Sequence, residues 1–324
     1  MWRKRIFWVF ALLLILLAGC TNGGPADKAG TDQANGVNET SDHDAADLIK
    51  VTTTIAQIAD AVKHIGGERV MVSSLMGPGV DPHLYQATQG DIKKLAEADI
   101  IFYNGLQLEG KMNEILETIS REKPTYALGE RVPTELLKAD EDNPDQYDPH
   151  IWFDIPLWKE ALKQITEALI QLDPEHEAVY REHEVSYFQE LDELHQYALE
   201  QIETIPEESR VLITAHDAFG YFGEAYGLEV MGLQGLSTEA EYGLRDVQEL
   251  IELVISRDIK AVFIESSISE RSIQAVIEGA KERGHDLVIG GELFSDAMGE
   301  EGTPEGTYVG MFKHNIDTIV GSLK

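Results

Sequence analysis

Hydrophobic and polar positions follow two alternating periods along most of the chain. Short apolar runs rich in Val and Ile are typical of buried strands, and apolar residues at three- and four-residue steps predict helices. In the first half of the chain the pattern predicts strands at 49–54, 70–72 and 100–103 and helices at 55–65 and 88–98. In the second half it predicts strands at 211–214, 229–233, 261–265 and 287–289 and helices at 218–226, 244–256, 273–283 and 309–323. This alternation predicts an α/β fold with mostly parallel sheets covered by helices.

A longer helical pattern separates the two halves. Residues 176–205 contain neither Gly nor Pro, and apolar side chains recur there at helical spacing. Asp173-Pro174 is a start signal and Pro206 is a stop signal. We expect one long, rigid helix over 176–205 that links an N-terminal lobe (48–175) to a C-terminal lobe (206–324). Periodicity alone also permits a helix that simply packs within a single domain.

The N-terminus carries an export signal. Three basic residues at positions 3–5 precede an apolar run over 6–17, which is too short to span a bilayer and is typical of a cleaved signal over residues 1–19. The sequence then reads Leu-Ala-Gly-Cys, which resembles a bacterial lipobox, and Cys20 is the only cysteine. We therefore expect lipidation at Cys20, a flexible polar tether over 20–47, and an extracytoplasmic protein anchored to the cell membrane. An ordinary signal followed by an incidental cysteine is the alternative.

The charge balance is strongly acidic. The chain has 26 Lys and Arg against 58 Asp and Glu, a formal net charge of −32. Such a surface repels nucleic acid and attracts cations, so we expect no nucleic-acid partner. Solubility alone would explain the same composition.

Three of the ten histidines stand in a setting that suits metal binding. His83 and His150 each follow an Asp-Pro pair, and His216 directly follows a predicted strand. Proline restricts the backbone on both sides of itself, so each of the first two histidines leaves a pre-set turn. Ligands of α/β proteins bind at the carboxyl ends of strands, and imidazole and carboxylate are metal ligands. Together the three histidines predict a metal site, whereas Asp296 is by spacing alone one acid among many.

Four long motifs give the chain a family resemblance. It resembles the metal-binding lipoproteins of manganese and zinc ABC importers, a family that includes pneumococcal surface adhesin A and the treponemal protein TroA. The motifs are Gly77–His83, Asp148–Asp154, Val211–Phe222 and Gly302–Tyr308. The resemblance implies two lobes joined by one rigid helix, with one divalent transition-metal ion held between them as cargo.

The same resemblance implies site residues and partners. The ligand positions of the family fall on His83, His150, His216 and Asp296, and Glu265 matches a glutamate near the cleft that could support a ligand. The expected partners are the permease subunit of an ABC importer and, through Cys20, the membrane. We expect a monomer that is not an enzyme.

The identity of the cargo stays open between Mn²⁺ and Zn²⁺. Many manganese-selective members carry glutamate at the third position, where this chain has His216, and this favours zinc tolerance. Zinc-specialised members carry a long, acidic, histidine-rich loop. The stretch compared with it here, residues 138–147, is also acidic but is short and contains no histidine. A dedicated zinc-uptake protein is therefore one alternative. A secreted metallohydrolase and a surface adhesin are alternatives of another class.

Overall fold

The computed structural model describes residues 48–140, 143–240 and 242–324. The expected signal, Cys20 and the whole of the expected tether (20–47) lie outside the described residues. Within the described ranges, the structure has no helix with the length and apolar character needed to cross a membrane.

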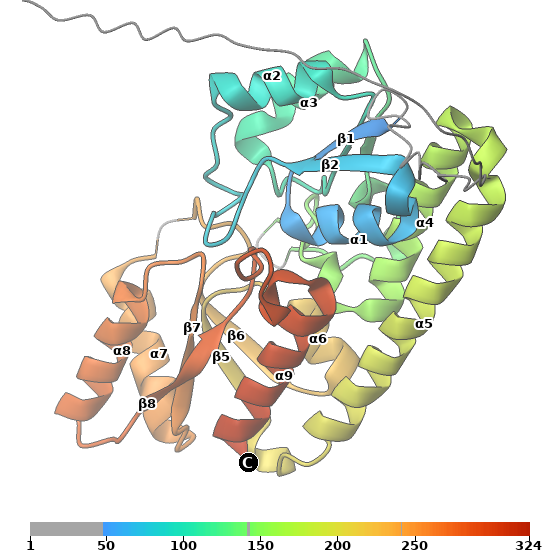
Figure 1. Cartoon of the computed structure of the whole chain (residues 1–324). Coiled ribbons are helices and arrows are strands. Elements are labelled where there is room, and N and C mark those ends of the chain that lie inside the picture. Colours follow the sequence, from blue (N-terminus) through green and yellow to red (C-terminus); the bar gives the residue numbers. More distant parts are fainter. Residues whose placement is uncertain (1–47, 141–142, 241) are drawn as a thin grey trace, which may run out of the picture. The chain divides into compact units, whose positions relative to one another are not determined.

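The N-terminal lobe is built on one parallel sheet (Figure 1). Its order is β2-β1-β3-β4. The strands are β1 (Ile49–Thr53), β2 (Val70–Ser74), β3 (Ile100–Tyr103) and β4 (Thr125–Ala127), and the helices between them are α1 (Ala56–Gly66), α2 (Gln89–Glu97) and α3 (Asn113–Ser120). The predicted α/β class is confirmed, although the sequence analysis did not anticipate α3 or β4.

The C-terminal lobe contains two parallel strand pairs, β5–β6 and β7–β8. The strands are β5 (Val211–His216), β6 (Glu229–Gln234), β7 (Ala261–Glu265) and β8 (Val288–Leu293), and the helices are α6 (Gly220–Tyr226), α7 (Leu244–Ser256), α8 (Arg271–Glu282) and α9 (Tyr308–Leu323). The prediction ended the last strand at Ile289, but β8 continues to Leu293. Gly290 and Gly291 interrupt the apolar run there, while a register shift opposite them at Val262/Phe263 keeps the strands paired.

Two long helices follow the N-terminal sheet in the sequence, and the second of them contacts both lobes. The first, α4 (Ile155–Leu172), was not predicted; it begins where the side chain of Asp154 accepts a hydrogen bond from the Leu157 amide at 3.0 Å. The helix α5 (Glu177–Ile202) has 26 residues, which corresponds to a length of about 39 Å. It packs against α1 and α4 of the N-terminal lobe and against α6 and α9 of the C-terminal lobe (Figure 1).

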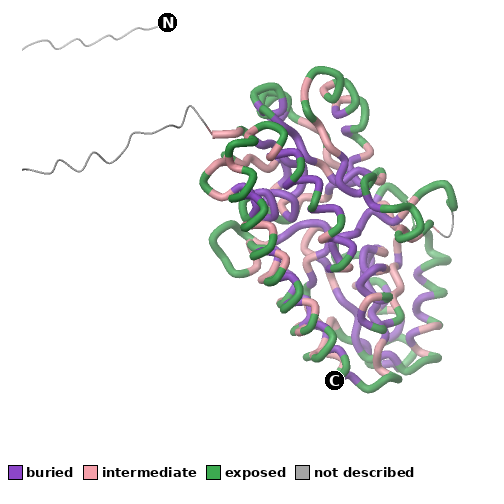
Figure 2. The backbone as a smooth tube through the Cα atoms, turned by 90° about the vertical axis from the view of Figure 1, so that its right-hand side faces the viewer, coloured by how far each residue is buried: buried purple, intermediate pink, exposed green. Residues whose placement is uncertain are grey.

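One hydrophobic core extends through both lobes. Figure 2 shows buried backbone continuing from one lobe into the other. Phe153, just before α4, stacks on Phe219 with ring centroids 4.5 Å apart. Phe222 of α6 in turn lies 5.7 Å from Phe312 of α9. Because these rings are fully buried, separating the lobes as rigid bodies would expose a large aromatic surface.

Candidate metal centre

The C-terminal lobe brings its polar groups together at the carboxyl ends of its strands. His216 is the last residue of the fully buried strand β5, and Glu265 is the last residue of β7. Asp296 lies three residues beyond the end of β8. Parallel strands end at the same edge of a sheet, so residues distant in sequence meet there.

The N-terminal lobe contributes two histidines from two similar turns. In each Asp-Pro-His segment, the aspartate Oδ1 accepts a hydrogen bond from the histidine backbone N–H at 2.9 Å: Asp81 from His83, and Asp148 from His150. This local bond is typical of aspartate in turns. It fixes the direction in which each imidazole leaves the backbone.

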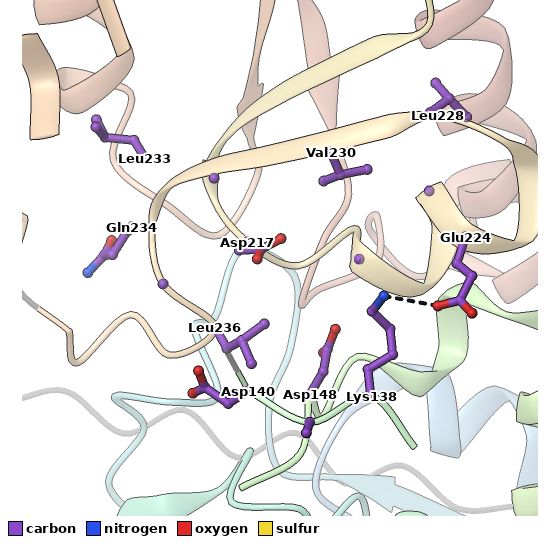
Figure 3. A pocket seen from close by; sticks show the side chains of 15 residues that line it. Lys138, Asp140, Asp148, Asp217, Glu224, Leu228, Val230, Leu233, Gln234 and Leu236 are labelled. Carbon is purple, nitrogen blue, oxygen red and sulfur yellow. Dashed lines mark hydrogen bonds and ion pairs between the residues drawn. The ribbon is translucent and has the colours of Figure 1, made fainter. Parts of the chain in front are cut away.

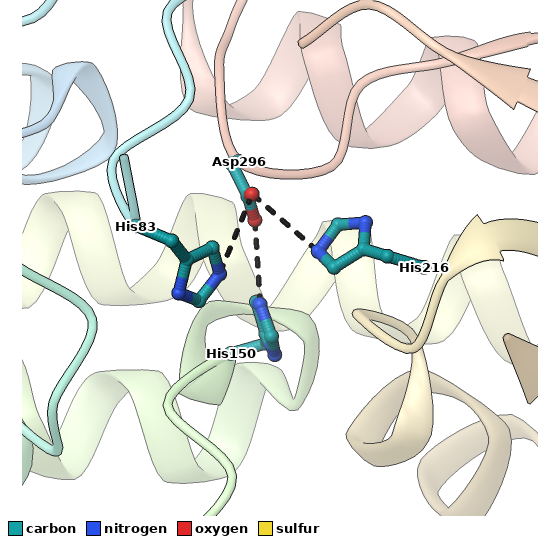
Figure 4. Close-up of side chains that lie close together, drawn as sticks. All are labelled: His83, His150, His216 and Asp296. Carbon is teal, nitrogen blue, oxygen red and sulfur yellow. Dashed lines mark ion pairs between the residues drawn. The ribbon is translucent and has the colours of Figure 1, made fainter. Parts of the chain in front are cut away.

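The four predicted residues meet in one buried cluster, here called the His₃Asp cluster (Figure 4). The Nε2 atoms of His83, His150 and His216 lie 3.6, 3.3 and 3.4 Å from the nearest carboxylate oxygen of Asp296. Each of the four residues offers an atom within 4.8 Å of the others, and none is more than 2% exposed. Asp296 Oδ1 faces His150, and its Oδ2 faces His83 and His216.

Carboxylates orient two of the three imidazoles from behind. The Nδ1 atom of His150 lies 2.7 Å from Asp148 Oδ1, and the Nδ1 atom of His216 lies 2.5 Å from Glu265 Oε2. Glu265 also accepts the backbone N–H of His216 at 2.9 Å. Such partners direct the Nε2 lone pair toward a metal and raise its basicity. Among the described residues, Nδ1 of His83 has no hydrogen-bond partner.

Asp148 was not predicted as a residue of the site, and Glu265 was predicted only as a group near the cleft. Both Asp-Pro-His segments contain an aspartate at the same offset, so that pattern was readable. The two aspartates nevertheless differ: Asp148 reaches the ring of its histidine, whereas Asp81 Oδ2 accepts a hydrogen bond from Thr238 Oγ1 of the C-terminal lobe at 2.7 Å.

The three imidazoles have different electrostatic environments. Burial lowers the pKa of His83 to about 3, despite the nearby Asp296. Burial opposes protonation of His150 as well, but the charge of Asp148 and its hydrogen bond, together with Asp296, raise the pKa of His150 to about 9. In the same way, Glu265 and Asp296 outweigh burial and hold the pKa of His216 well above its usual value.

Asp296 is the carboxylate on which the three rings converge. Burial alone would raise its pKa, but the charge of His216 and the close approach of the His150 and His216 rings to its oxygens hold the pKa well below the usual range. Outside the His₃Asp cluster, burial and the charge of Asp148 raise the pKa of Asp217 to about 6.

The donor atoms of the cluster lack conventional hydrogen-bond partners. Within the described part of the chain, none of the three Nε2 atoms and neither Asp296 oxygen has one. Buried polar atoms are rarely left in this state, because an unmade hydrogen bond costs about 1–3 kcal/mol per group. Five such atoms that face one point fit a cation between them.

Hydrogen bonds from three buried side chains to main-chain carbonyls hold the loops of the cluster in place. Gln57 of α1 donates to the Asp296 carbonyl at 3.1 Å, and the Trp152 indole N–H donates to the Ser295 carbonyl at 3.1 Å. The Asn104 amide donates to the Pro149 carbonyl at 2.9 Å, just before His150. These side chains come from the N-terminal lobe, and two of them hold the loop of Asp296 in the C-terminal lobe.

The remaining described histidines lie elsewhere. His64 interacts with Asp60, His176 with Asp173, His195 with Tyr226, and the rings of His183, His285 and His314 with backbone carbonyls. His43 lies outside the described residues. Ordinary local contacts therefore account for these six rings.

A two-lobed α/β body with a buried cluster of three histidines and one aspartate that could hold a metal ion is typical of one class, the metal-binding solute-binding proteins of ABC importers. The family model for the zinc-uptake complex component A, periplasmic (ZnuA), matches residues 51–322. The chain belongs to this family, and the resemblance predicted from its motifs is confirmed.

Individual relatives agree over the same region. The manganese-binding lipoprotein MntA of Bacillus subtilis is 55% identical over 277 residues, which cover 85% of this chain and 90% of the relative. The zinc-binding protein TroA of Treponema pallidum is 49% identical over 274 residues, covering 84% of this chain and 88% of TroA. A solved structure of the periplasmic zinc-binding protein TroA from Treponema pallidum superposes with a TM-score of 0.83 at 48% identity, covering 85% of this chain and 99% of that one.

Proposed function

We propose that the His₃Asp cluster captures one Mn²⁺ or Zn²⁺ ion and that the protein delivers this ion to the permease subunit of an ABC importer. In this proposal His83, His150, His216 and Asp296 are the metal ligands, and Asp148 and Glu265 orient two of them. Relatives named as a manganese-binding lipoprotein and as a zinc-binding protein support this range of cargo.

The observation that carries the proposal is the spacing of the donor atoms. A tetrahedral ion with bonds of about 2.1 Å holds its ligand atoms about 3.4 Å apart. The three closest imidazole–carboxylate distances are 3.3, 3.4 and 3.6 Å. The imidazole–carboxylate spacing of the cluster therefore matches an ion of this size, and all four donor atoms lie within 4.8 Å of one another.

The orientation of Asp296 bears on the choice between the two ions. Three imidazoles and one oxygen satisfy tetrahedral zinc, and the Irving–Williams order favours zinc over manganese in affinity. Both oxygens of Asp296 face the imidazoles, so a bidentate carboxylate would raise the coordination number toward the value that manganese prefers. We favour manganese as the delivered cargo, with a dedicated zinc-uptake protein as the second candidate because His216 supplies a third imidazole.

Capture without catalysis is part of the same proposal. A metallohydrolase needs an open coordination position and a nearby general base, whereas four protein ligands close this site.

We further propose that Cys20 carries a lipid anchor at the outer face of the cell membrane and that residues 20–47 form a tether. In the same proposal, residues 176–205 link an N-terminal lobe over 48–175 to a C-terminal lobe over 206–324. The lipoprotein names of relatives support the anchor.

Calorimetry on the protein without its signal tests the ligand set. His83→Ala and Asp296→Ala should each weaken binding of Mn²⁺ and Zn²⁺ by at least about a hundredfold, because each removes a direct ligand. His314→Ala, at a half-buried ring outside the cluster, should leave affinity unchanged. Unaltered binding in the two ligand variants, with native circular dichroism, would refute the assignment. Competition between the two ions in the unmodified protein then identifies the preferred cargo.

A further inference from the structure

A cavity lies next to the His₃Asp cluster, beside residues that precede or follow two of its histidines. It has a volume of about 760 Å³ and opens between residues 138–140 and 148 of the N-terminal lobe and residues 217–236 of the C-terminal lobe. Figure 3 shows the carboxylates of Asp148 and Asp217 at this cavity, with the ion pair of Lys138 and Glu224 beside them. The cavity therefore lies where the two lobes meet and where an ion could approach the cluster.

Asp148 presents an unused oxygen to this cavity. Its Oδ1 is occupied by the backbone and ring of His150, at 2.9 and 2.7 Å. Its Oδ2 is buried and has no hydrogen-bond partner among the described residues, in a side chain that is only 2% exposed. A Cβ atom added to Gly220 would come within 2.9 Å of Oδ2, so the glycine leaves space for a ligand beside that oxygen.

Asp217 supplies a second carboxylate. It follows His216 directly, and its backbone N–H donates to the Gln234 carbonyl at 3.0 Å. In the described part of the chain its side chain forms no hydrogen bond or ion pair, although it lines the cavity. The free Oδ2 atom of Asp148 and the carboxylate of Asp217 therefore line one partly enclosed space. Like charges there repel each other, and a divalent cation between them removes that cost.

The basic side chain that lines the cavity is already paired with another carboxylate. Among the described lining residues the only basic side chain is Lys138. Its ammonium group bonds Glu224 Oε2 at 2.9 Å. The cavity is therefore acidic overall, and an acidic cleft concentrates cations.

We propose that Asp148 and Asp217 form an outer cation site, through which a hydrated divalent ion passes on its way into and out of the His₃Asp cluster. The inference rests on the proposed metal-capture function, and it adds a route for an ion whose final ligands are at most 2% exposed. Each carboxylate is attached to an inner ligand: Asp148 by its hydrogen bond to His150, and Asp217 by the chain to His216.

The chemistry of the outer site differs from that of the inner cluster. Carboxylate and water ligands suit Mn²⁺, Mg²⁺ and Ca²⁺, whereas imidazole suits zinc and other later transition metals. The outer site therefore binds hydrated ions weakly and without strong selection, and the inner cluster selects among them. Mg²⁺ should compete with Mn²⁺ at the outer site only.

Stopped-flow kinetics with Mn²⁺ as the probe test this route. Asp217→Asn should slow both Mn²⁺ association and chelator-induced dissociation by about tenfold, because one charge near a divalent ion is removed from the path. The equilibrium affinity should stay the same. Asp286→Asn removes the same charge from an exposed turn of the C-terminal lobe, and should change either rate by less than about twofold because distant exposed charges are screened.

A measurement on the unmodified protein provides an independent test. Mg²⁺ at constant ionic strength should slow Mn²⁺ association in the unmodified protein and not in Asp217→Asn. Equal rates in Asp217→Asn and Asp286→Asn, or no effect of Mg²⁺ on the unmodified protein, would overturn the outer site. If the unmodified protein itself fails to bind Mn²⁺ or Zn²⁺ tightly, the proposed function fails instead, so the two failures are distinguishable.

Discussion

Metal binding at the His₃Asp cluster should depend steeply on pH, because the ion must displace protons. The pKa of His150 is raised to about 9 and that of His216 well above its usual value, so both rings carry an extra proton at neutral pH. The pKa of His83 is lowered to about 3, so this ring is already neutral. A divalent ion that binds to the Nε2 atoms must therefore displace one proton from His150 and one from His216. The net charge of the site stays the same, because two protons leave as one divalent ion enters.

The size of the effect follows from linkage. Each displaced proton changes the apparent affinity about tenfold per pH unit below the pKa of its group, so two protons give about a hundredfold per unit. The proton of His150, with its pKa of about 9, alone weakens binding at pH 7 by about a hundredfold, or about 2.7 kcal/mol. Affinity rises with pH because the rings lose their protons, and the His150 contribution levels off above about pH 9.

Calorimetry in two buffers with different ionisation enthalpies measures the number of protons released. We expect about two at pH 7, and an apparent dissociation constant about a hundredfold larger at pH 6 than at pH 7. Glu265→Gln removes the leading charge that raises the pKa of His216, and should bring the count toward one. His64→Gln is the matched control and should leave the number of released protons unchanged. The pKa of His64 is also about 9, but its partner is Asp60, outside the cluster. Release of fewer than one proton by the unmodified protein would refute the reasoning.

Two further substitutions test the connection between the lobes. Thr238→Val removes the hydrogen bond to Asp81 at 2.7 Å. A bond to a carboxylate contributes about 1.5 kcal/mol, so the metal should dissociate about tenfold faster when a chelator is added in excess. An unchanged dissociation rate would show that this bond does not restrain His83. Phe222→Ala should lower the free energy of unfolding by about 3–5 kcal/mol in urea titration. A loss below about 1 kcal/mol would contradict a core shared by both lobes.

The sequence predicted the elements whose signals are local and separate. The strands β1, β5 and β7 are short apolar runs that end in polar residues, and the structure has them close to the predicted bounds. The long helix was predicted over 176–205 and is observed over 177–202, with His176 in the preceding 3₁₀ turn. Helix α4 was missed although its signals were present: Asp154 as a cap, Pro156 in the first turn, and ten buried residues at helical spacing.

The sequence predicted the four residues that meet in the His₃Asp cluster, but not all of the side chains that orient them. The Asp-Pro-His turns and the strand end at His216 are local features, and the family resemblance added Asp296. The different roles of Asp81 and Asp148 depend on tertiary contacts instead. Thr238, the partner of Asp81, is 157 positions away, and no local pattern shows which of two identical motifs will receive it.

The shared core limits how the cluster can release its ion. Aromatic rings from residue 153, α6 and α9 pack together between the lobes, and α5 contacts helices of both lobes. Opening the lobes as rigid bodies would break this packing, and aromatic burial is costly to lose. The proposed ligands lie in loops or at strand ends, where movement costs less. We therefore expect release to depend on local movement of the loops that carry His83 and Asp296, while the helices and the core keep the two lobes together.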